Sequence, residues 1–224
     1  MLAPPSKGEL ARQIAEKLDL RPLSYDYEIL LDLYESRSAT AGELRPLSRA
    51  SDTTFYSLLK SLEARGLIES DADADDRRRR RYRVTDTTRV KLDQQYAGLP
   101  AWIDRKLSDQ PGGDHGLRDF FRLCREQLRI RFFTPEFQIL LVLFEYGSRT
   151  AGQLADLCDV STTSFYRALK MLSGKQLIVP DAQQADQRIK RYRLAQDTYE
   201  ELALLHAQLR EWVLRTLGDQ IRTG

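Results

Sequence analysis

Residues 51–85 read SDTTFYSLLKSLEARGLIESDADADDRRRRRYRVT, and residues 161–195 read STTSFYRALKMLSGKQLIVPDAQQADQRIKRYRLA. Every residue of the second stretch lies about 110 positions after its counterpart, without a gap. The match extends to residues 24–87 and 134–197, with an identity of about 40%. The chain therefore contains an internal duplication, and we call these two ranges the first and the second repeat.

The central motif of each repeat opens with a short helix. Thr40 and Glu43 form a capping-box pattern, in which the threonine hydroxyl accepts from the amide three residues on while the acid reaches back. The second repeat keeps this pattern with Thr150 and Gln153. Pro46 lies inside the short helix of the first repeat, so we expect that helix to be distorted or shortened.

A longer helix follows directly in each repeat. Ser51 and Ser161 are its expected N-caps, and three apolar residues at helical spacing form its buried stripe. The stripe consists of Phe55, Leu59 and Leu62 in the first repeat and of Phe165, Leu169 and Leu172 in the second. Two adjacent helices of which the first is very short are typical of a helix-turn-helix.

A pair of strands around a polar loop follows each of these helices. The strands are expected at residues 67–69 and 82–84, and again at residues 177–179 and 192–194. A hairpin directly after a helix-turn-helix is a wing. The predicted fold class is therefore mainly α with small β-hairpins, arranged as two tandem winged helix-turn-helix domains joined through terminal helices.

Amphipathic segments flank the repeats. Residues 86–107 and 196–217 carry apolar side chains at helical spacing, and residues 6–20 are predicted to form a first helix. The stretch QPGGDHG at residues 110–116 has the composition of a linker. We therefore expect a first unit at residues 1–109, a linker at residues 110–116 and a second unit at residues 117–224.

The solvent face of the longer helix suits a DNA major groove. Its hydroxyl and basic side chains can contact base edges or phosphates once the apolar stripe is buried. Capping explains Ser51 and Ser161, but it does not explain why Tyr56 and Tyr166 point outward in both repeats. The predicted contacts are Thr53, Thr54, Tyr56, Ser57, Lys60, Thr163, Ser164, Tyr166, Arg167 and Lys170.

The wing carries a concentration of positive charge. Arginine is unbroken from Arg77 to Arg81, and the second repeat keeps a milder version that includes Arg188 and Lys190. A charge run is usually only a solvated surface, but beside a helix-turn-helix it favours insertion of an arginine into the narrow, electronegative minor groove. Acidic residues in the same hairpin nearly offset these arginines, which explains a net charge of only +2.

The order of elements and one stretch of sequence resemble the MarR family of bacterial winged-helix regulators. The stretch is LEARGLIESDADADDRRRRRYRVTD at residues 62–86, which is similar to the family's sequence from the recognition helix through the wing into the dimerisation helix. Asp76 and Arg78 fall on the family's Asp-x-Arg, and Val84 and Thr85 fall on its hydrophobic-Thr step. The resemblance covers both repeats well and the flanking helices only by pattern.

The resemblance implies roles for the wing residues. In the family the wing arginine reads the minor groove and the aspartate orients it, and these roles fall to Arg78 and Arg188 and to Asp76 and Asp186. The second repeat departs from the pattern at Gln176, where the first repeat has a glycine. The predicted wing contacts are Asp76, Arg77, Arg78, Arg79, Arg80, Asp186, Arg188 and Lys190.

The duplication itself departs from the family, whose members are usually homodimers that read pseudo-palindromic DNA. Here we expect a monomer that acts as a pseudo-dimer, with further self-association left open. Its two recognition helices, about 34 Å apart, would enter successive major grooves of double-stranded DNA. Because Ser57 in the first repeat corresponds to Arg167 in the second, we expect a sequence-specific transcriptional regulator with unequal half-sites, of which the second includes a guanine.

Other functions fit parts of the same sequence. One alternative is a low-specificity, chromosome-organising DNA binder, and another is a winged-helix protein-interaction module. Catalysis is not expected, because the histidines His115 and His206 lie in the linker and in a terminal helix, and the sequence lacks metal-ligand spacing and a Gly-rich phosphate loop. We accordingly expect no catalytic residue, cofactor or metal.

Signals for regulation are weaker. A small aromatic effector is a further candidate partner, although aromatic stripes at helical spacing are more often core. The residues that would line its pocket are Tyr25, Tyr27, Tyr34, Phe133, Phe137 and Phe144. Cys124 is a weaker candidate for redox sensing, and Cys158 is expected to be a small core residue.

Bulk composition indicates a globular intracellular protein. The 224 residues are 42% hydrophobic and 30% charged. Both cysteines lie in the second half and have no counterpart in the first, which argues against a disulfide framework and for a reducing cytoplasm. The sequence has no apolar run of membrane-spanning length and no signal-peptide core, so we expect location in the cytoplasm, at the bacterial nucleoid.

Overall fold

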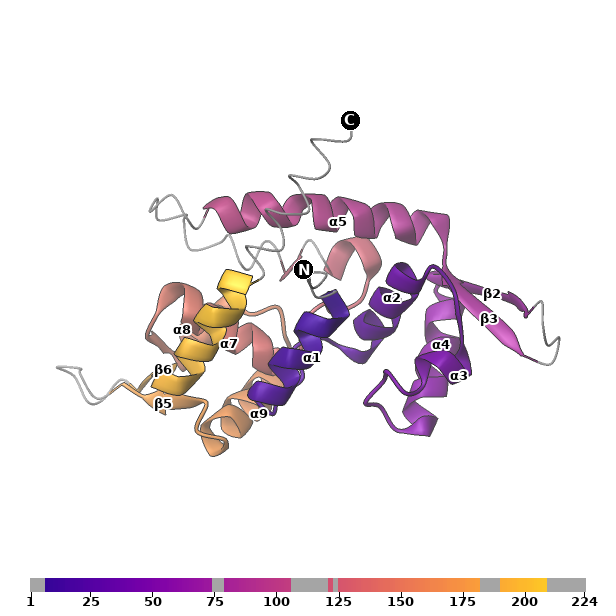
Figure 1. Cartoon of the computed structure of the whole chain (residues 1–224). Coiled ribbons are helices and arrows are strands. Elements are labelled where there is room, and N and C mark those ends of the chain that lie inside the picture. The colour runs from indigo at the N-terminus through magenta and orange to yellow at the C-terminus, as the bar shows by residue number, and fades with distance from the viewer. Residues whose placement is uncertain (1–6, 74–78, 106–120, 123–124, 182–189, 209–224) are drawn as a thin grey trace, which may run out of the picture. The chain divides into compact units, whose positions relative to one another are not determined.

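The computed structural model of the chain describes residues 7–73, 79–105, 121–122, 125–181 and 190–208 (Figure 1). Its helices are α1 (Lys7–Lys17), α2 (Tyr25–Ser36), α3 (Ala41–Leu44), α4 (Asp52–Ala64), α5 (Asp86–Arg105), α7 (Pro135–Tyr146), α8 (Ala151–Leu157) and α9 (Thr162–Gly174). Its strands are β1 (Ala39–Thr40), β2 (Ile68–Ala72), β3 (Arg80–Val84), β4 (Arg149–Thr150), β5 (Ile178–Pro180) and β6 (Arg191–Leu194). Residues 196–208 are also helical.

Each repeat contains one three-stranded antiparallel sheet. The strand order is β1-β3-β2 in the first repeat and β4-β6-β5 in the second. Ala39 pairs with Tyr82 in the first sheet, and Arg149 pairs with Tyr192 in the second, so the strand registers are equivalent. The predicted combination of helices with small antiparallel hairpins is confirmed.

Local sequence explains how each helix-turn-helix begins. The capping box forms in both repeats: the Thr40 amide donates to Glu43 Oε2 at 2.6 Å, and the Thr150 amide donates to Gln153 Oε1 at 3.0 Å. The short helix ends at Leu44 in the first repeat but continues to Leu157 in the second. This difference agrees with the expected effect of a proline that cannot donate a helical hydrogen bond.

The longer helix of each motif packs through the predicted apolar stripe. Phe55, Leu59 and Leu62 of α4 are at most 1% exposed, and their counterparts in α9 are at most 5% exposed. Burial of such side chains contributes roughly 1.5–3 kcal/mol each. The stripe therefore holds the opposite face of α4 and of α9 toward solvent.

The chain divides into two compact units that differ from the contiguous halves expected at residues 1–109 and 117–224. The second-repeat unit comprises Met1–Pro22, Leu99–Leu123 and Phe133–Gly224. The first-repeat unit comprises Leu23–Gly98 and Cys124–Phe132. Each repeat thus shares its unit with the helical segment that precedes the other repeat. The linker expected at residues 110–116 lies outside the described residues.

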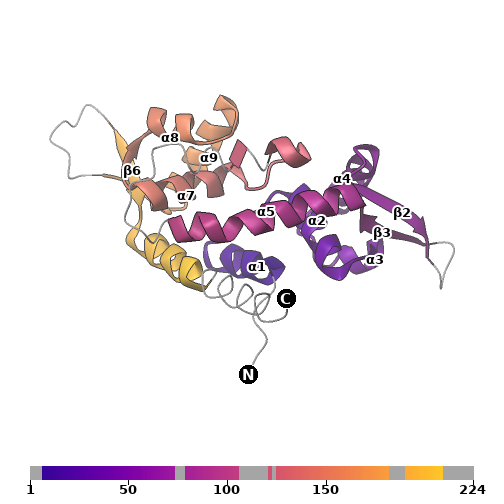
Figure 2. The ribbon, with the colours of Figure 1, turned by 90° about the horizontal axis from the view of Figure 1, so that it is seen from above.

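In the second-repeat unit, α1 lies beside the helix of residues 196–208 (Figures 1 and 2). Lys17 Nζ forms an ion pair with Glu201 at 2.7 Å. After α1, Leu18 and Leu20 enter a hydrophobic cluster with α7, α8 and α9 and are each 5% exposed. The segment before the first repeat therefore supplies part of the core beneath the second.

In the first-repeat unit, residues 125–132 take the equivalent place in the sequence of the repeat. The Ser24 amide donates to the Phe132 carbonyl at 3.0 Å, and the ring centroids of Phe132 and Tyr27 are 4.0 Å apart. Leu128 is 1% exposed, and Ile130 is 5% exposed. Leu128 and Ile130 are the counterparts of Leu18 and Leu20, which are buried in the other unit.

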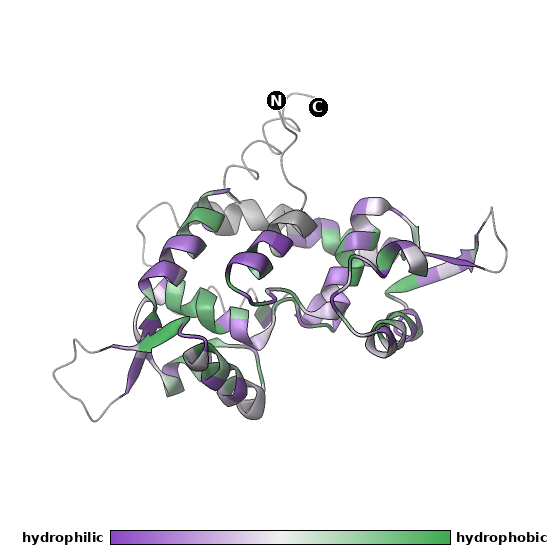
Figure 3. Ribbon diagram, turned by 60° about the horizontal axis from the view of Figure 1, so that its bottom comes forward, coloured by the Kyte–Doolittle hydropathy of each residue, from purple (hydrophilic) through white to green (hydrophobic). Residues whose placement is uncertain are grey.

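The wings differ in polarity between their strands. In the second repeat the residues of β5 are mainly apolar, whereas β6 is strongly hydrophilic (Figure 3). In the first repeat, β2 and β3 form a hairpin that follows the end of α4 (Figures 1 and 2). Each hairpin therefore brings polar side chains next to its recognition helix.

Candidate nucleic-acid interface

The recognition helices α4 and α9 present matching tyrosines. Tyr56 is 51% exposed and Tyr166 is 54% exposed, so both side chains reach solvent as predicted. Each ring packs edge-on against the buried phenylalanine before it, with ring centroids 5.3 Å apart for Phe55 and Tyr56 and 5.2 Å apart for the second pair. The tyrosines are thus large, oriented groups on an otherwise polar surface.

Two of the predicted contacts belong to the helix caps. Ser51 Oγ accepts from the Thr54 amide at 3.3 Å and lies 2.9 Å from the Thr54 hydroxyl oxygen. Ser161 and Ser164 repeat this arrangement with the same two distances. The hydroxyls of Thr54 and Ser164 therefore complete the N-terminus of each recognition helix.

The remaining predicted side chains of the recognition helices are exposed. They lie on the same solvent face as the tyrosines, and none of them belongs to the buried stripe. They are Thr53, Ser57, Lys60, Thr163, Arg167 and Lys170. This face combines hydroxyl, aromatic and basic groups, which suit contacts with base edges and phosphates.

An ion pair connects the two helices of the motif in the first repeat. Arg45 donates through Nε to Asp52, and its guanidinium lies 5.7 Å from the ring centroid of Phe55. The corresponding residues in the second repeat are Ala155 and Thr162, which cannot form an ion pair. The turn before the recognition helix is therefore stabilised differently in the two repeats.

Glu63 lies where the recognition helix meets the first wing. Its Oε1 accepts from the Ser70 hydroxyl at 2.6 Å and lies 3.2 Å from Arg80 Nη2. Tyr82 is part of the same junction, where burial is the main cause that raises the pKa of its phenol. The first wing is thus joined to α4 through a carboxylate.

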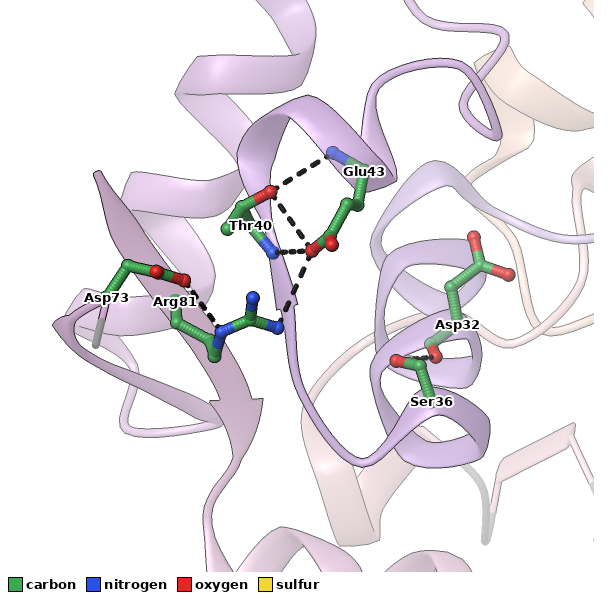
Figure 4. A network of polar contacts seen from close by, with 6 residues as sticks. All are labelled: Asp32, Ser36, Thr40, Glu43, Asp73 and Arg81. Atoms are coloured by element: carbon green, nitrogen blue, oxygen red, sulfur yellow. Dashed lines mark hydrogen bonds and ion pairs between the residues drawn. The ribbon is translucent and has the colours of Figure 1, made fainter. Parts of the chain in front are cut away.

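The second arginine of β3 lies between two carboxylates (Figure 4). Arg81 Nε donates to Asp73 Oδ2 at 2.8 Å, and Arg81 Nη1 lies 3.6 Å from Glu43 Oε2. Asp73 is only 5% exposed. Hydrogen bonds from Thr40, and secondarily the charge of Arg81, hold the pKa of Glu43 below its ordinary value.

The third arginine of β3 pairs across the hairpin. Arg83 Nε donates to Glu69 Oε1 at 2.8 Å, and Arg83 Nη1 donates to Asp71 at 2.5 Å. The hydrogen bond to Asp71, followed by that to Glu69, raises the pKa of the guanidinium. Arg80, Arg81 and Arg83 therefore each have at least one carboxylate partner within the first repeat.

The described cations of the second wing contact an aromatic ring and backbone carbonyls. Lys190 is exposed, and its Nζ lies 5.2 Å from the ring centroid of Tyr192. Arg191 donates to the Ser148 carbonyl at 3.4 Å, and Arg193 donates to the Leu194 carbonyl at 3.2 Å. These two contacts are with backbone oxygens, whereas the contacts described above for the first wing are with side-chain carboxylates.

The described residues include only part of the predicted wing contacts. Arg79 and Arg80 are exposed, as is Lys190 in the second repeat. The other predicted wing contacts lie outside the described residues; they are Asp76, Arg77, Arg78, Asp186 and Arg188. The roles of these five residues therefore stay predictions.

From the sequence, the acids of the first wing were expected only to offset the charge of its arginines. In the structure they form specific pairs with those arginines. Strand register carried a signal for them, because Glu69 stands opposite Arg83, and Asp71 stands opposite Arg81, on β2 and β3. The ion pair of Arg81 with Asp73 is diagonal to this register. Opposite charges at such positions indicate specific cross-strand pairs.

The aromatic residues considered for an effector pocket serve several packing roles. Tyr27 is 1% exposed and Phe137 is 4% exposed, so both belong to the core. Tyr34 donates to Asp93, and burial together with this bond raises the pKa of the Tyr34 phenol to about 12. Phe144 packs against Tyr199, with ring centroids 5.4 Å apart.

Cys158 is a core residue, as predicted. It is 6% exposed, and burial raises the pKa of its thiol to about 12. A thiol with so high a pKa is a poor nucleophile at neutral pH. Cys124 lies outside the described residues.

Within residues 7–73, 79–105, 121–122, 125–181 and 190–208, no group of three or more His, Cys, Asp or Glu residues is arranged to hold a metal ion. Across the same ranges, no helix has the length and apolar character needed to cross a membrane.

Comparison with known proteins supports the assignment of the first repeat. Residues 24–87 match the profile of a family described as winged helix DNA-binding domain. No curated protein matches the chain. The family match covers the helix-turn-helix and the wing described above.

Solved structures of a protein named AbfR resemble the chain weakly, at 16% sequence identity. The disulfide-formed structure has a TM-score of 0.30 and covers 59% of this chain and 94% of its own. The overoxidized and reduced structures, both bound to DNA, have TM-scores of 0.29 and cover 62% of this chain and 98% of their own. These scores are too low to inform function here. Residues 24–87, which match this profile, contain the helix-turn-helix and the hairpin of a winged helix.

Proposed function

We propose that the protein is a sequence-specific transcriptional regulator that binds double-stranded DNA, with one chain acting as a pseudo-dimer. The observation that carries this proposal is the pair of exposed recognition faces on α4 and α9, with Tyr56 and Tyr166 at equivalent positions. Each face adjoins a wing that carries cations. The match of residues 24–87 to a DNA-binding domain supports the same conclusion.

Each recognition helix would enter the major groove by its N-terminal half. In the first repeat, base edges would be contacted by Tyr56 and Ser57, and a phosphate one turn further on by Lys60. In the second repeat, Tyr166, Arg167 and Lys170 would make the same contacts. The N-terminal dipole of each helix also favours the approach of phosphate.

The wings would contact the adjacent minor grooves. By resemblance to the MarR family, Arg78 and Arg188 would enter the groove, oriented by Asp76 and Asp186. Arg79, Arg80 and Lys190 would add contacts to the backbone. The same resemblance suggests a bacterial protein of the nucleoid.

The two halves would read different sequences. Arg167 can donate two hydrogen bonds to guanine in the major groove, whereas Ser57 at the equivalent position is short and uncharged. A homodimer cannot diversify its halves, but a duplicated chain can. The proposed operator therefore has two unequal half-sites.

A duplex-binding titration tests the proposal. Fluorescence anisotropy would compare labelled double-stranded and single-stranded DNA at several salt concentrations. We expect preferential duplex binding with a steep salt dependence, and a decrease of about one in the salt slope for Lys60→Ala or Lys170→Ala. Lys17→Ala is the control, because Lys17 belongs to α1 and pairs with Glu201 of the helix of residues 196–208.

Three results would contradict parts of the proposal. Absence of binding at low salt would remove DNA as the partner and favour a protein-interaction module. Equal affinity for single strands would contradict groove recognition. Binding that bulk competitor DNA displaces completely would favour a low-specificity, chromosome-organising protein.

A further inference from the structure

The cations of the first wing lie against carboxylates of their own repeat. Arg80 contacts Glu63 at 3.2 Å, Arg81 contacts Glu43 at 3.6 Å, and Arg83 Nε contacts Glu69 at 2.8 Å. These three glutamates come from three different elements, namely α4, α3 and β2. A cation in such a pair must leave or share its carboxylate to contact a DNA phosphate.

The second repeat has replaced these acids while keeping the cations. Lys190, Arg191 and Arg193 stand at the positions of the three arginines. The counterparts of Glu43, Glu63, Glu69 and Asp73 are Gln153, Ser173, Val179 and Gln183. Of the acids that contact these arginines in the first repeat, only Asp71 is kept, as Asp181. The repeats therefore differ in the acids around the cations far more than in the cations themselves.

The position of Glu63 makes this difference relevant to DNA. Tyr56, Lys60 and Glu63 are spaced so that they share one face of α4, which is the face proposed to approach the duplex. The Glu63 carboxylate would meet approaching phosphates with like charge, and it also neutralises Arg80. At the equivalent place in α9 the second repeat presents Ser173, which carries no charge.

Exposed ion pairs of this kind contribute little to the free energy of folding, so breaking them costs little. The Arg80 and Glu63 side chains are 58% and 30% exposed, and pairs at such exposures contribute about 0–1 kcal/mol. Their main effect on DNA binding is therefore through charge. Each cation that is no longer offset can displace about one counterion from the phosphate backbone.

We propose that the second repeat makes the stronger contact with the DNA backbone, because Glu43, Glu63 and Glu69 restrain the wing arginines of the first repeat. This inference rests on the proposed function. It assigns the three glutamates as positioning residues that weaken one half of the protein. The first half would then engage DNA mainly after the second has bound.

Exchanging the acids between repeats tests the inference. One variant combines Glu43→Gln with Glu63→Ser, and its converse combines Gln153→Glu with Ser173→Glu. Glutamine at position 43 keeps the capping box, as Gln153 already does at 3.0 Å from the Thr150 amide. The variant that carries all four changes retains the net charge of the chain, so it controls for bulk electrostatics.

Affinity for a labelled duplex of about 30 base pairs, long enough for two half-sites, would be measured across salt concentrations. The first variant should bind roughly 3- to 10-fold more tightly at low salt, with a salt slope steeper by about one to two. The converse variant should bind correspondingly more weakly. Adding Arg80→Ala and Arg81→Ala to the first variant should abolish the gain, as expected if the glutamates act through these arginines.

Unchanged or weaker binding by the Glu43→Gln, Glu63→Ser variant would overturn the inference, because the glutamates would then orient the arginines for DNA. Glu63→Gln is the companion variant that keeps an acceptor for the Ser70 hydroxyl and so protects the fold. Unmodified protein that binds no duplex would overturn the proposed function itself, and the inference with it. Unmodified protein that binds while both variants match it would overturn the inference alone.

Discussion

Lys175 donates through Nζ to the backbone carbonyl and to the carboxylate of Asp19, which lies at the other end of the sequence. Their counterparts make the same kind of contact, because Arg65 donates to the carbonyl of Arg129. Each pair lies within one compact unit. The end of each recognition helix is thus attached to the helical segment that precedes the other repeat, so each half of the sequence contributes to the stability of the other.

Because each repeat shares its compact unit with the segment that precedes the other repeat, we can predict which unit a core mutation destabilises. Leu18→Ala should destabilise the second-repeat unit by about 2–5 kcal/mol, because Leu18 is 5% exposed in a cluster with Phe137 and Leu140. Hydrogen exchange should accelerate in α7 and α9 before it does in α2 and α4. Leu128→Ala is the matched variant, since Leu128 is 1% exposed in the first-repeat unit and should show the opposite order. Equal loss of protection from hydrogen exchange in both units would contradict this grouping of segments.

The turn after each recognition helix predicts a difference in backbone strain. Gly66 has φ +66°, and Gln176 at the equivalent position has φ +58°. Glutamine is disfavoured in this left-handed region, so Gln176→Gly should stabilise the protein by about 0.5–1 kcal/mol in urea unfolding. Gly66→Gln should destabilise it by a similar amount. No gain from Gln176→Gly would show that the turn imposes no such strain.

The Tyr34–Asp93 hydrogen bond predicts an effect at alkaline pH. The pKa of the phenol is raised from 10.0 to about 12, so the bond's contribution is complete below pH 10 and is lost as the pH rises through 12. Tyr34→Phe should cost about 0.5–1.5 kcal/mol at neutral pH, as for a typical hydrogen bond, and less near pH 12. Absorbance titration should show one late-titrating tyrosine that this variant lacks. A cost that does not depend on pH would contradict the assignment.

The divergence of the recognition helices predicts separable specificity. Arg167→Ser should relax the preference for one base pair in the second half-site by about 1–3 kcal/mol and leave the first half-site unchanged. Ser57→Arg should add a preference at the corresponding position of the first half-site. Competition with single-base variants of the preferred duplex measures both effects. Uniform weakening across all sequences would instead identify Arg167 as a phosphate contact.

Much of the fold follows from local sequence. The capping boxes at Thr40 and Thr150 and the serine caps of the recognition helices formed as expected, because they depend on residues only three positions apart. The shorter first helix agrees with the expected effect of Pro46. The exposed tyrosines followed from the periodicity of the buried stripe.

Features that depend on distant residues could not be predicted in this way. The grouping of α1 with the second repeat requires knowledge of which core accepts Leu18 and Leu20, and their apolar spacing is compatible with either core. The pairing of Arg81 with Glu43 and Asp73 depends on hairpin register and on the position of α3. In the sequence Asp73 was therefore counted only as bulk charge, and Glu43 only as part of the capping box, although both are partners of Arg81 in the fold.

The central claim, that one chain reads two half-sites on duplex DNA, is tested most directly by binding-site selection followed by measurement of stoichiometry. Selection from random duplexes with purified protein would define the preferred sequence, and light scattering of the complex would count the chains on it. We predict one asymmetric sequence with two half-sites about one turn of the DNA helix apart, bound by a single chain. A symmetric palindrome bound by two chains, or no enriched sequence at all, would contradict it.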